Sequence, residues 1–292
     1  MIYRITHQTR YVYNAPVTFC HNEVRLLPRD VPNQVRRTAR LMVDPPPTAL
    51  RERIDFFGNR VSYFAVQRPH EELAVTAASE VEVHPAESPD PEISPPWETV
   101  REMLTRRTDT EAVDARQYTF DSTLVSASPA LRDYAAPSFP PGRPVLAGAR
   151  ELMARIFTEF KFVPGFTSVA TPLSHVLKHR RGVCQDFAQV AVGALRSLGL
   201  AARYVSGYLE TLPPPGQQKL QGADVSHAWY SVWSPEAGWV DFDPTNNLMP
   251  RDRHVTTAWG RDYQDVTPVK GVLFSGGGHK LIVSVDVERV GE

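Results

Sequence analysis

Cysteine is scarce in this chain of 292 residues, which contains only Cys20 and Cys184. Two cysteines that lie far apart cannot form the framework of disulfides that stabilises small secreted domains. The sequence also lacks any apolar run near the ~20 residues that span a bilayer. Its first residues have neither the basic segment nor the long apolar segment of a signal peptide. These absences predict a cytoplasmic protein with reduced thiols that does not enter a membrane.

Neither sign of charge is in excess, because 33 acidic residues face 32 basic ones. A balanced chain has no overall field that would attract nucleic acid or an acidic membrane surface, so neither is expected as a partner. Acidic calcium loops are missing, and Gly276-Gly277-Gly278 lacks the context of a phosphate-binding loop. His175 and His179 have a helical spacing that suits zinc, but no third ligand is evident. We therefore predict no metal and no cofactor.

Hydrophobic periodicity divides the chain into two parts. Residues 1–84 alternate between apolar and polar side chains, and Gly58-Asn59 is a hairpin signal, so this part is predicted to be a β-sandwich. Residues 85–96 are rich in proline and are predicted to be a semi-rigid linker. Helical spacing appears only beyond that point. Residues 97–292 are therefore predicted to form a second domain, of the α+β class.

Cys184 lies at the start of a predicted helix, in the segment Arg-Gly-Val-Cys-Gln-Asp-Phe-Ala at residues 181–188. Apolar residues recur at three- and four-residue steps from Phe187 to Leu198, and Gly199 is a suitable end. Free amides and the positive dipole at a helix N-terminus stabilise a thiolate and can hold an oxyanion. The alternative is an inert buried thiol, which is the interpretation we give to Cys20.

A base and its orienting acid are predicted on the hairpin that follows. One strand contains Ser-His-Ala-Trp at residues 226–229, and the returning strand contains Gly-Trp-Val-Asp-Phe-Asp-Pro-Thr-Asn at residues 238–246. A five-residue loop would pair Trp233 with Trp239, and this register places His227 diagonal to Asp243 on one face of the sheet. A slip of one residue would separate them. A Cys-His-Asp arrangement is thus geometrically possible.

The three motifs, taken in this order, resemble those of the bacterial transglutaminase-like family, whose members are also described as cysteine proteases with a papain-like core. The resemblance implies that Cys184 is the nucleophile, His227 the base and Asp243 the orienting acid. It also implies an N-terminal β-sandwich followed by a papain-like core of helices packed on an antiparallel sheet. Asp186 belongs to the motif, either as a catalytic residue or as an ordinary acidic residue of a first helical turn. For the oxyanion we identify only the backbone amide of Cys184.

Three functions are compatible with these residues. A thiol hydrolase of amide or peptide bonds and an acyltransferase that joins glutamine to an amine share one thioester, so the triad does not separate them. A non-catalytic binding module is the third. We favour the hydrolase, with a peptide or protein as acyl donor, because the signature of a calcium-regulated cross-linker is missing. The oligomeric state is not predicted.

Two further features of the second part have open interpretations. The segment at residues 211–222 connects a core strand to the strand of His227, so it is expected to overhang the site as a rim. Trp229, Trp233 and Trp239 share the face of His227. They form either an aromatic wall for substrate or the packed core of the hairpin.

Overall fold

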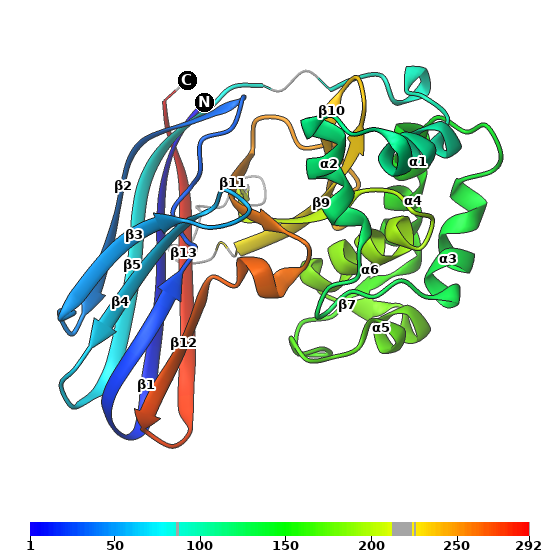
Figure 1. The fold of residues 1–292 in the computed structure, drawn as a ribbon. Helices are drawn as coiled ribbons and strands as arrows, with labels where there is room; N and C mark the ends of the chain where they lie inside the picture. The colour runs from blue at the N-terminus through cyan, green and yellow to red at the C-terminus, as the bar shows by residue number, and fades with distance from the viewer. Residues whose placement is uncertain (86–87, 212–223, 225, 292) are drawn as a thin grey trace, which may run out of the picture.

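The computed structural model describes residues 1–85, 88–211, 224 and 226–291, and its elements form three layers (Figure 1). A strand-rich layer contains the N-terminal region, helices form the opposite side, and a four-stranded sheet lies between them. The N-terminal region supplies five strands to the first layer: β1 (Ile2–Val24), β2 (Gln34–Asp44), β3 (Ala49–Ile54), β4 (Arg60–Val66) and β5 (His70–Val83).

Both ends of the chain belong to this first layer. The C-terminal strands β12 (Val269–Ser275) and β13 (His279–Gly291) pair with β1, so the layer is a seven-stranded sheet. Ile2 lies opposite Gly291, and the two termini are side by side in Figure 1. The sequence assigned residues 97–292 to the second domain as a whole. The structure differs at its C-terminal end, because β12 and β13 complete the N-terminal sheet instead.

One long strand, β1, organises this sheet. Its first half lies between β5 and β13, and its second half lies between β4 and β12. Buried apolar side chains from β1, β4 and β5 gather in a common core that includes Val17, Phe64 and Leu73. The predicted sandwich is therefore built as one hydrogen-bonded sheet around a shared strand. The expected hairpin turn is present, with Gly58 at φ +76°, where a Cβ would be strained.

The four-stranded sheet has the order β10-β9-β8-β11. Its strands are β8 (Ala202–Leu209), β9 (Ser226–Ser234), β10 (Gly238–Phe242) and β11 (His254–Gly260). Neighbouring strands of this sheet are antiparallel, as expected for this fold class. A short parallel pair, β6 (Lys161–Phe162) with β7 (Arg181–Gly182), lies just before the helix of Cys184.

Six α-helices and four short 3₁₀ helices accompany this sheet among the described residues. They are α1 (Trp97–Arg106), α2 (Thr110–Arg116), α3 (Pro129–Ala135), α4 (Val145–Glu159), α5 (Leu173–His179), α6 (Cys184–Arg196), η1 (Pro91–Ile93), η2 (Gln117–Thr119), η3 (Ala136–Ser138) and η4 (Tyr263–Val266). The helix α6 is buried over almost its whole length and packs on β8 and β9. A buried apolar helix of this kind is held by tertiary packing, so it gives its first residue a fixed position.

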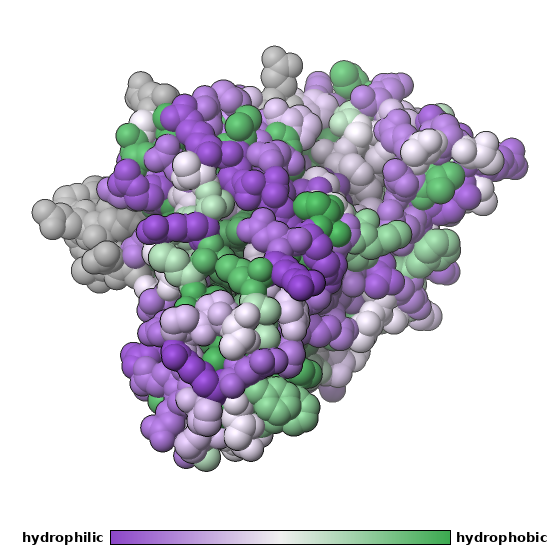
Figure 2. Space-filling view, turned by 60° about the vertical axis from the view of Figure 1, so that its left-hand side comes forward, coloured by the Kyte–Doolittle hydropathy of each residue, from purple (hydrophilic) through white to green (hydrophobic). Residues whose placement is uncertain are grey.

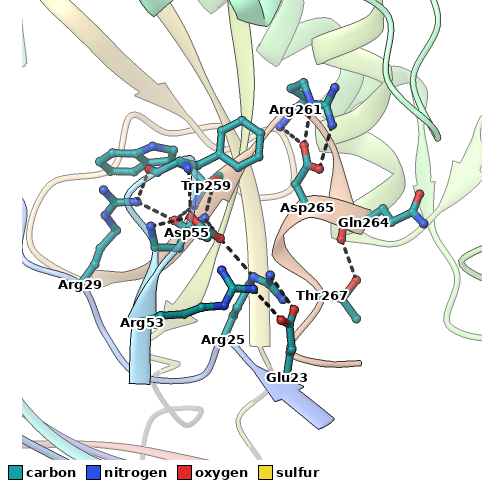
Figure 3. A network of polar contacts seen from close by, with 12 residues as sticks. Glu23, Arg25, Arg29, Arg53, Asp55, Trp259, Arg261, Gln264, Asp265 and Thr267 are labelled. Atoms are coloured by element: carbon teal, nitrogen blue, oxygen red, sulfur yellow. Dashed lines mark hydrogen bonds and ion pairs between the residues drawn. The ribbon is translucent and has the colours of Figure 1, made fainter. Parts of the chain in front are cut away.

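The two layers of strands meet at β11. Gln34 donates from Nε2 to the carbonyl of Thr256 (2.9 Å), and the amide of Thr256 donates back to Gln34 Oε1 (2.8 Å). Asn59 bonds the backbone of Trp259 in the same two-way manner, at 2.8 and 2.9 Å. Polar side chains around this contact form the network of Figure 3, in which Arg29 lies against Trp259. Such paired hydrogen bonds fix the N-terminal sheet relative to the four-stranded sheet.

The surface mixes polar and apolar residues. In Figure 2, hydrophilic side chains surround hydrophobic ones that gather near the middle of the face. Among the residues described, none of the helices has the length and apolar character needed to cross a membrane.

Candidate active site

Cys184 is the first residue of α6, where the sequence placed it. The preceding Val183 is extended, and its amide donates to Asp186 Oδ2 at 2.8 Å, which caps the helix. Thr167 Oγ1 donates to the same oxygen at 2.6 Å, and burial raises the pKa of the Asp186 carboxyl. A Cβ on Gly182 would lie only 2.6 Å from Asp186 Oδ2. Asp186 therefore holds the start of the helix to which Cys184 belongs.

The hairpin of β9 and β10 has the register that the sequence predicts. Trp239 lies opposite Trp233, and Asp241 lies opposite Ser231. His227 is the second residue of β9, and Asp243 follows directly after the end of β10. Since side chains alternate along both strands, this register brings His227 and Asp243 to one face.

His227 and Asp243 form a direct, buried contact. The ring Nε2 of His227 donates to Asp243 Oδ2 at 2.7 Å, and the two side chains are 7% and 0% exposed. The Cys184 thiol lies close enough to the same ring to raise its pKa. Because Nε2 is engaged by the carboxylate, Nδ1 is the ring nitrogen left for the thiol. The structure thus brings together all three residues that the motifs single out.

Asp243 receives more hydrogen bonds than the sequence predicts. His254 Nε2 donates to Asp243 Oδ2 at 3.0 Å, and Asn246 Nδ2 donates to the same oxygen at 2.8 Å. The other oxygen, Oδ1, accepts from the backbone amides of Thr245 (2.9 Å) and Asn246 (3.2 Å). A carboxylate with so many donors is held in one orientation and in its charged form.

His254 and Asn246 were not predicted as site residues. Asn246 ends the Asp-Pro-Thr-Asn run, so its position three residues after Asp243 was the available signal. His254 begins β11, on the far side of β8 from β9, and no local spacing relates it to Asp243. Both residues position the carboxylate.

Comparisons with known proteins identify the family of this chain. The model of the bacterial transglutaminase-like N-terminal region matches residues 3–82, and that of the transglutaminase-like superfamily matches residues 133–244. An uncharacterized protein of Mycobacterium bovis is 40% identical, over 98% of this chain and 92% of its own. The chain belongs to the bacterial transglutaminase-like family.

Two other proteins add to the comparison of this transglutaminase-like chain. A Cytophaga hutchinsonii protein, described as a candidate cysteine protease, has a crystal structure with a TM-score of 0.75. Its identity is 20%, over 99% of this chain and 90% of that one, so the likeness concerns the fold. A protein-glutamine gamma-glutamyltransferase of Pseudomonas aeruginosa is 39% identical over 72 residues, which are 24% of this chain and 11% of that protein.

Charge within the site of this transglutaminase-like chain is organised by burial and hydrogen bonding together. Burial alone lowers the pKa of His227, but the hydrogen bonds to Asp243 and Cys184 outweigh it and raise the pKa to about 10. Burial raises the pKa of Asp243, yet the bonds from His227 and His254 hold it well below its ordinary range. Both shifts favour an imidazolium next to a carboxylate.

These shifts predict a stability profile with pH. A raised histidine pKa stabilises the fold fully below about 6.5, its ordinary value, and this contribution is lost as pH rises toward 10. A lowered aspartate pKa stabilises the fold above about 3.8 and loses its contribution as pH falls. Asp243→Asn should therefore lower the free energy of unfolding by about 3 kcal/mol between pH 4 and pH 6.5.

Urea denaturation of the parent and Asp243→Asn proteins across pH 3 to 10 measures this difference. The difference in unfolding free energy should shrink at both ends of the range. A difference that stays constant with pH would mean that the contact between His227 and Asp243 is not an ion pair.

His227, Asp243 and His254 are also the three residues, among those described, whose ligand atoms lie close enough to hold a metal ion. Their separations are those of hydrogen bonds, since Asp243 Oδ2 lies 2.7 Å from one ring nitrogen and 3.0 Å from the other. Atoms bound ~2.0–2.1 Å from a tetrahedral zinc lie farther apart than these. The arrangement fits a carboxylate shared by two imidazoles.

The remaining sequence interpretations have mixed outcomes. Trp229 and Trp233 are fully buried, whereas Trp239 lines a cavity. The Trp229 ring stacks on His227 with a centroid distance of 6.1 Å. Cys20 is buried in the core of the N-terminal sheet, as expected. Of the segment predicted to overhang the site, residues 212–222 lie outside the described residues.

Proposed function

We propose that this protein is a thiol hydrolase of amide or peptide bonds, with Cys184 as nucleophile, His227 as base and Asp243 as orienting acid. The observation that carries the proposal is the buried His227 ring, which is bonded to Asp243 through Nε2 and lies near the Cys184 thiol, which raises the pKa of the ring. A nucleophile, a base and an orienting group in hydrogen-bond contact are the parts that covalent catalysis requires. The acyl donor would be a peptide or protein.

Acylation follows from these positions. The Cys184 proton lies on His227, which is then an imidazolium, and the thiolate attacks the carbonyl carbon of the substrate. The developing oxyanion lies next to the first-turn amides of α6, which have no carbonyl partner within the helix. His227 then gives its proton to the leaving amine, and the carbonyl carbon remains bound to sulfur as a thioester. Asp243 keeps the ring in the tautomer that this transfer needs.

Deacylation uses the same residues in the reverse order. His227 removes a proton from water, and the hydroxide attacks the thioester. The carboxylic acid leaves, and the proton returns to the Cys184 sulfur. An amine in place of water would give a new amide, so the alternative function is protein-glutamine acyltransferase. The local identity to a gamma-glutamyltransferase supports that alternative.

The sequence of the segment that precedes β9 favours water as the acceptor. Residues 211–222 contain one lysine and no acidic residue that would concentrate a cationic amine. A transferase also needs to exclude water from the acyl-enzyme. We therefore expect mostly free acid when a reactive acyl donor is supplied with millimolar primary amine. Liquid chromatography of acid and amide products measures the ratio.

Two controls make this test specific. Cys184→Ala should form neither product, whereas Cys20→Ala should behave as the parent protein. Predominance of amide at millimolar amine would replace the hydrolase by the transferase. Turnover by Cys184→Ala at the parent rate would contradict both. Cytoplasmic location and the lack of nucleic-acid and membrane partners stay predictions from the sequence.

A further inference from the structure

A cavity of about 1020 Å³ lies between the N-terminal sheet and the four-stranded sheet. Its walls come from the hairpin at Phe57, from Tyr118 in η2, and from Trp239, Trp259 and Arg203 of the four-stranded sheet. The volume is at the upper end for small-molecule sites, in which aromatic walls are combined with polar groups. Polar side chains that line this cavity include Asn33, Asp114, Gln117 and Asp241. None of the three residues of the triad lines this cavity.

The cavity is separate from the position of an acyl group on Cys184. His227 lies opposite Gly207 of β8, and Arg203 is four residues from Gly207 on that strand, a span of about 13 Å. Cys184 packs against the buried cluster of Tyr204, whose side chain points to the other face of the sheet from its neighbour Arg203. A ligand in the cavity would therefore not occupy the position of the acyl group.

Arg203 is a buried cationic group in the wall of the cavity. Its guanidinium contacts two indoles, with its central carbon 3.7 Å from the Trp259 ring centroid and 4.4 Å from that of Trp239. The residue is only 8% exposed. A guanidinium that stacks on aromatic rings keeps the N–H groups of its edge available to a ligand.

No hydrogen bond or ion pair to the Arg203 guanidinium is found within the described part of the chain, and its buried Nε has no partner. The contrast with Arg196 is informative, because Arg196 is 3% exposed and donates to the carbonyls of Tyr118, Ala202 and Arg261. This fold satisfies one buried guanidinium with backbone oxygens. The buried Nε of Arg203 is left without an acceptor, which is costly unless a ligand supplies one.

A second guanidinium, that of Arg29, contacts the same Trp259 ring from outside the lining of the cavity and donates to the Phe57 carbonyl and to Asn59 Oδ1. Arg29 lies on Trp259, with its central carbon 3.2 Å from the ring centroid (Figure 3). Burial and the nearby charge of Arg203 both lower the pKa of Arg29 to about 10. Two acids also line the cavity, Asp241 and the exposed Asp114. Asp241 is the one whose charge acts on Arg203, and its oxygens accept from Trp229 Nε1 (3.1 Å) and from the Ser231 hydroxyl. An anion would relieve the repulsion between the two arginines.

We propose that this cavity binds an organic carboxylate that carries an apolar or aromatic group, with the N–H edge of Arg203 holding the carboxylate. Two parallel N–H···O bonds match the fork of a guanidinium to the two oxygens of a carboxylate. The indoles and Tyr118 accommodate the apolar part. A free small acid and the C-terminus of a peptide share this chemistry.

Calorimetry on the full chain tests the site with four probes. We expect 3-phenylpropionate to bind saturably and its neutral amide to bind at least tenfold more weakly. A tetrapeptide that ends in phenylalanine, with a free or an amidated C-terminus, distinguishes a peptide C-terminus from a free small acid as the source of the carboxylate. Preference for the free peptide over 3-phenylpropionate assigns a peptide terminus, and the reverse assigns a small acid. Equal binding of acids and amides, or no saturation at millimolar concentration, would overturn the proposal.

Two variants locate the binding. Arg203→Met should weaken 3-phenylpropionate binding at least tenfold. Ala237→Trp places a large ring at the exposed rim of the cavity without removing Arg203, so it should also weaken binding. This second variant tests the site even if Arg203→Met does not fold. Cys184→Ala should bind as the parent protein does, which separates this site from the proposed activity. Unchanged binding in folded Ala237→Trp, or tighter binding of inorganic phosphate than of carboxylate, would contradict the assignment.

Discussion

Asp243→Asn should lower kcat by about 10³- to 10⁴-fold. The amide of asparagine can donate to His227 Nε2, which would move the ring proton to Nδ1 and remove the acceptor that faces Cys184. Asp243 Oδ2 accepts from His227, His254 and Asn246, so the substitution changes the tautomer without opening a cavity. Steady-state kinetics with a reactive ester donor at 25 °C, together with circular dichroism, measure the loss in folded protein.

Asp241→Asn is the matched control, because Asp241 lies two residues earlier on the same face. It accepts from Trp229 and Ser231, and no contact between it and His227 occurs among the described residues. We expect its kcat to fall tenfold or less. A larger loss in Asp241→Asn than in Asp243→Asn would show that Asp241 orients the ring instead.

Cys184 should react with iodoacetamide about 100-fold faster than Cys20 at pH 7. Cys184 is partly exposed at the start of α6 and lies near His227, whose pKa it raises. Cys20 is 1% exposed, and burial raises the pKa of its thiol. Peptide mapping by mass spectrometry at timed intervals gives the two rates.

His227→Ala should reduce the rate at Cys184 and leave the rate at Cys20 unchanged. The corresponding control in the N-terminal sheet is substitution of His70, the histidine next to the other cysteine. Its Nε2 lies 3.8 Å from the Cys20 sulfur. Equal alkylation rates of the two cysteines in the folded parent protein would contradict the activated nucleophile.

Local patterns predicted much of the site. The five-residue loop set the hairpin register, and that register alone placed His227 next to Asp243. Apolar spacing likewise predicted a helix that has Cys184 in its first turn. Both features depend on residues that are near in sequence, where turn length and helical period limit the alternatives.

Contacts between distant segments were not predictable in this way. The strands β12 and β13 come from the opposite end of the chain and pair with β1. Alternation of apolar and polar residues identifies a strand, but it does not identify the strand with which it pairs. His254 reaches Asp243 through the order of the strands. Arg203 meets Trp259 and Trp239 only when the sheet is assembled. Side-chain partners of this kind follow from topology.

The central claim is that Cys184 carries the acyl group. The most direct measurement mixes the protein with a reactive peptide ester, quenches it in acid within milliseconds, and maps the adduct by mass spectrometry. We expect an acyl mass on the peptide that contains Cys184 and its loss on treatment with hydroxylamine. An adduct on another residue, or turnover of the ester by Cys184→Ala without any adduct, would contradict it.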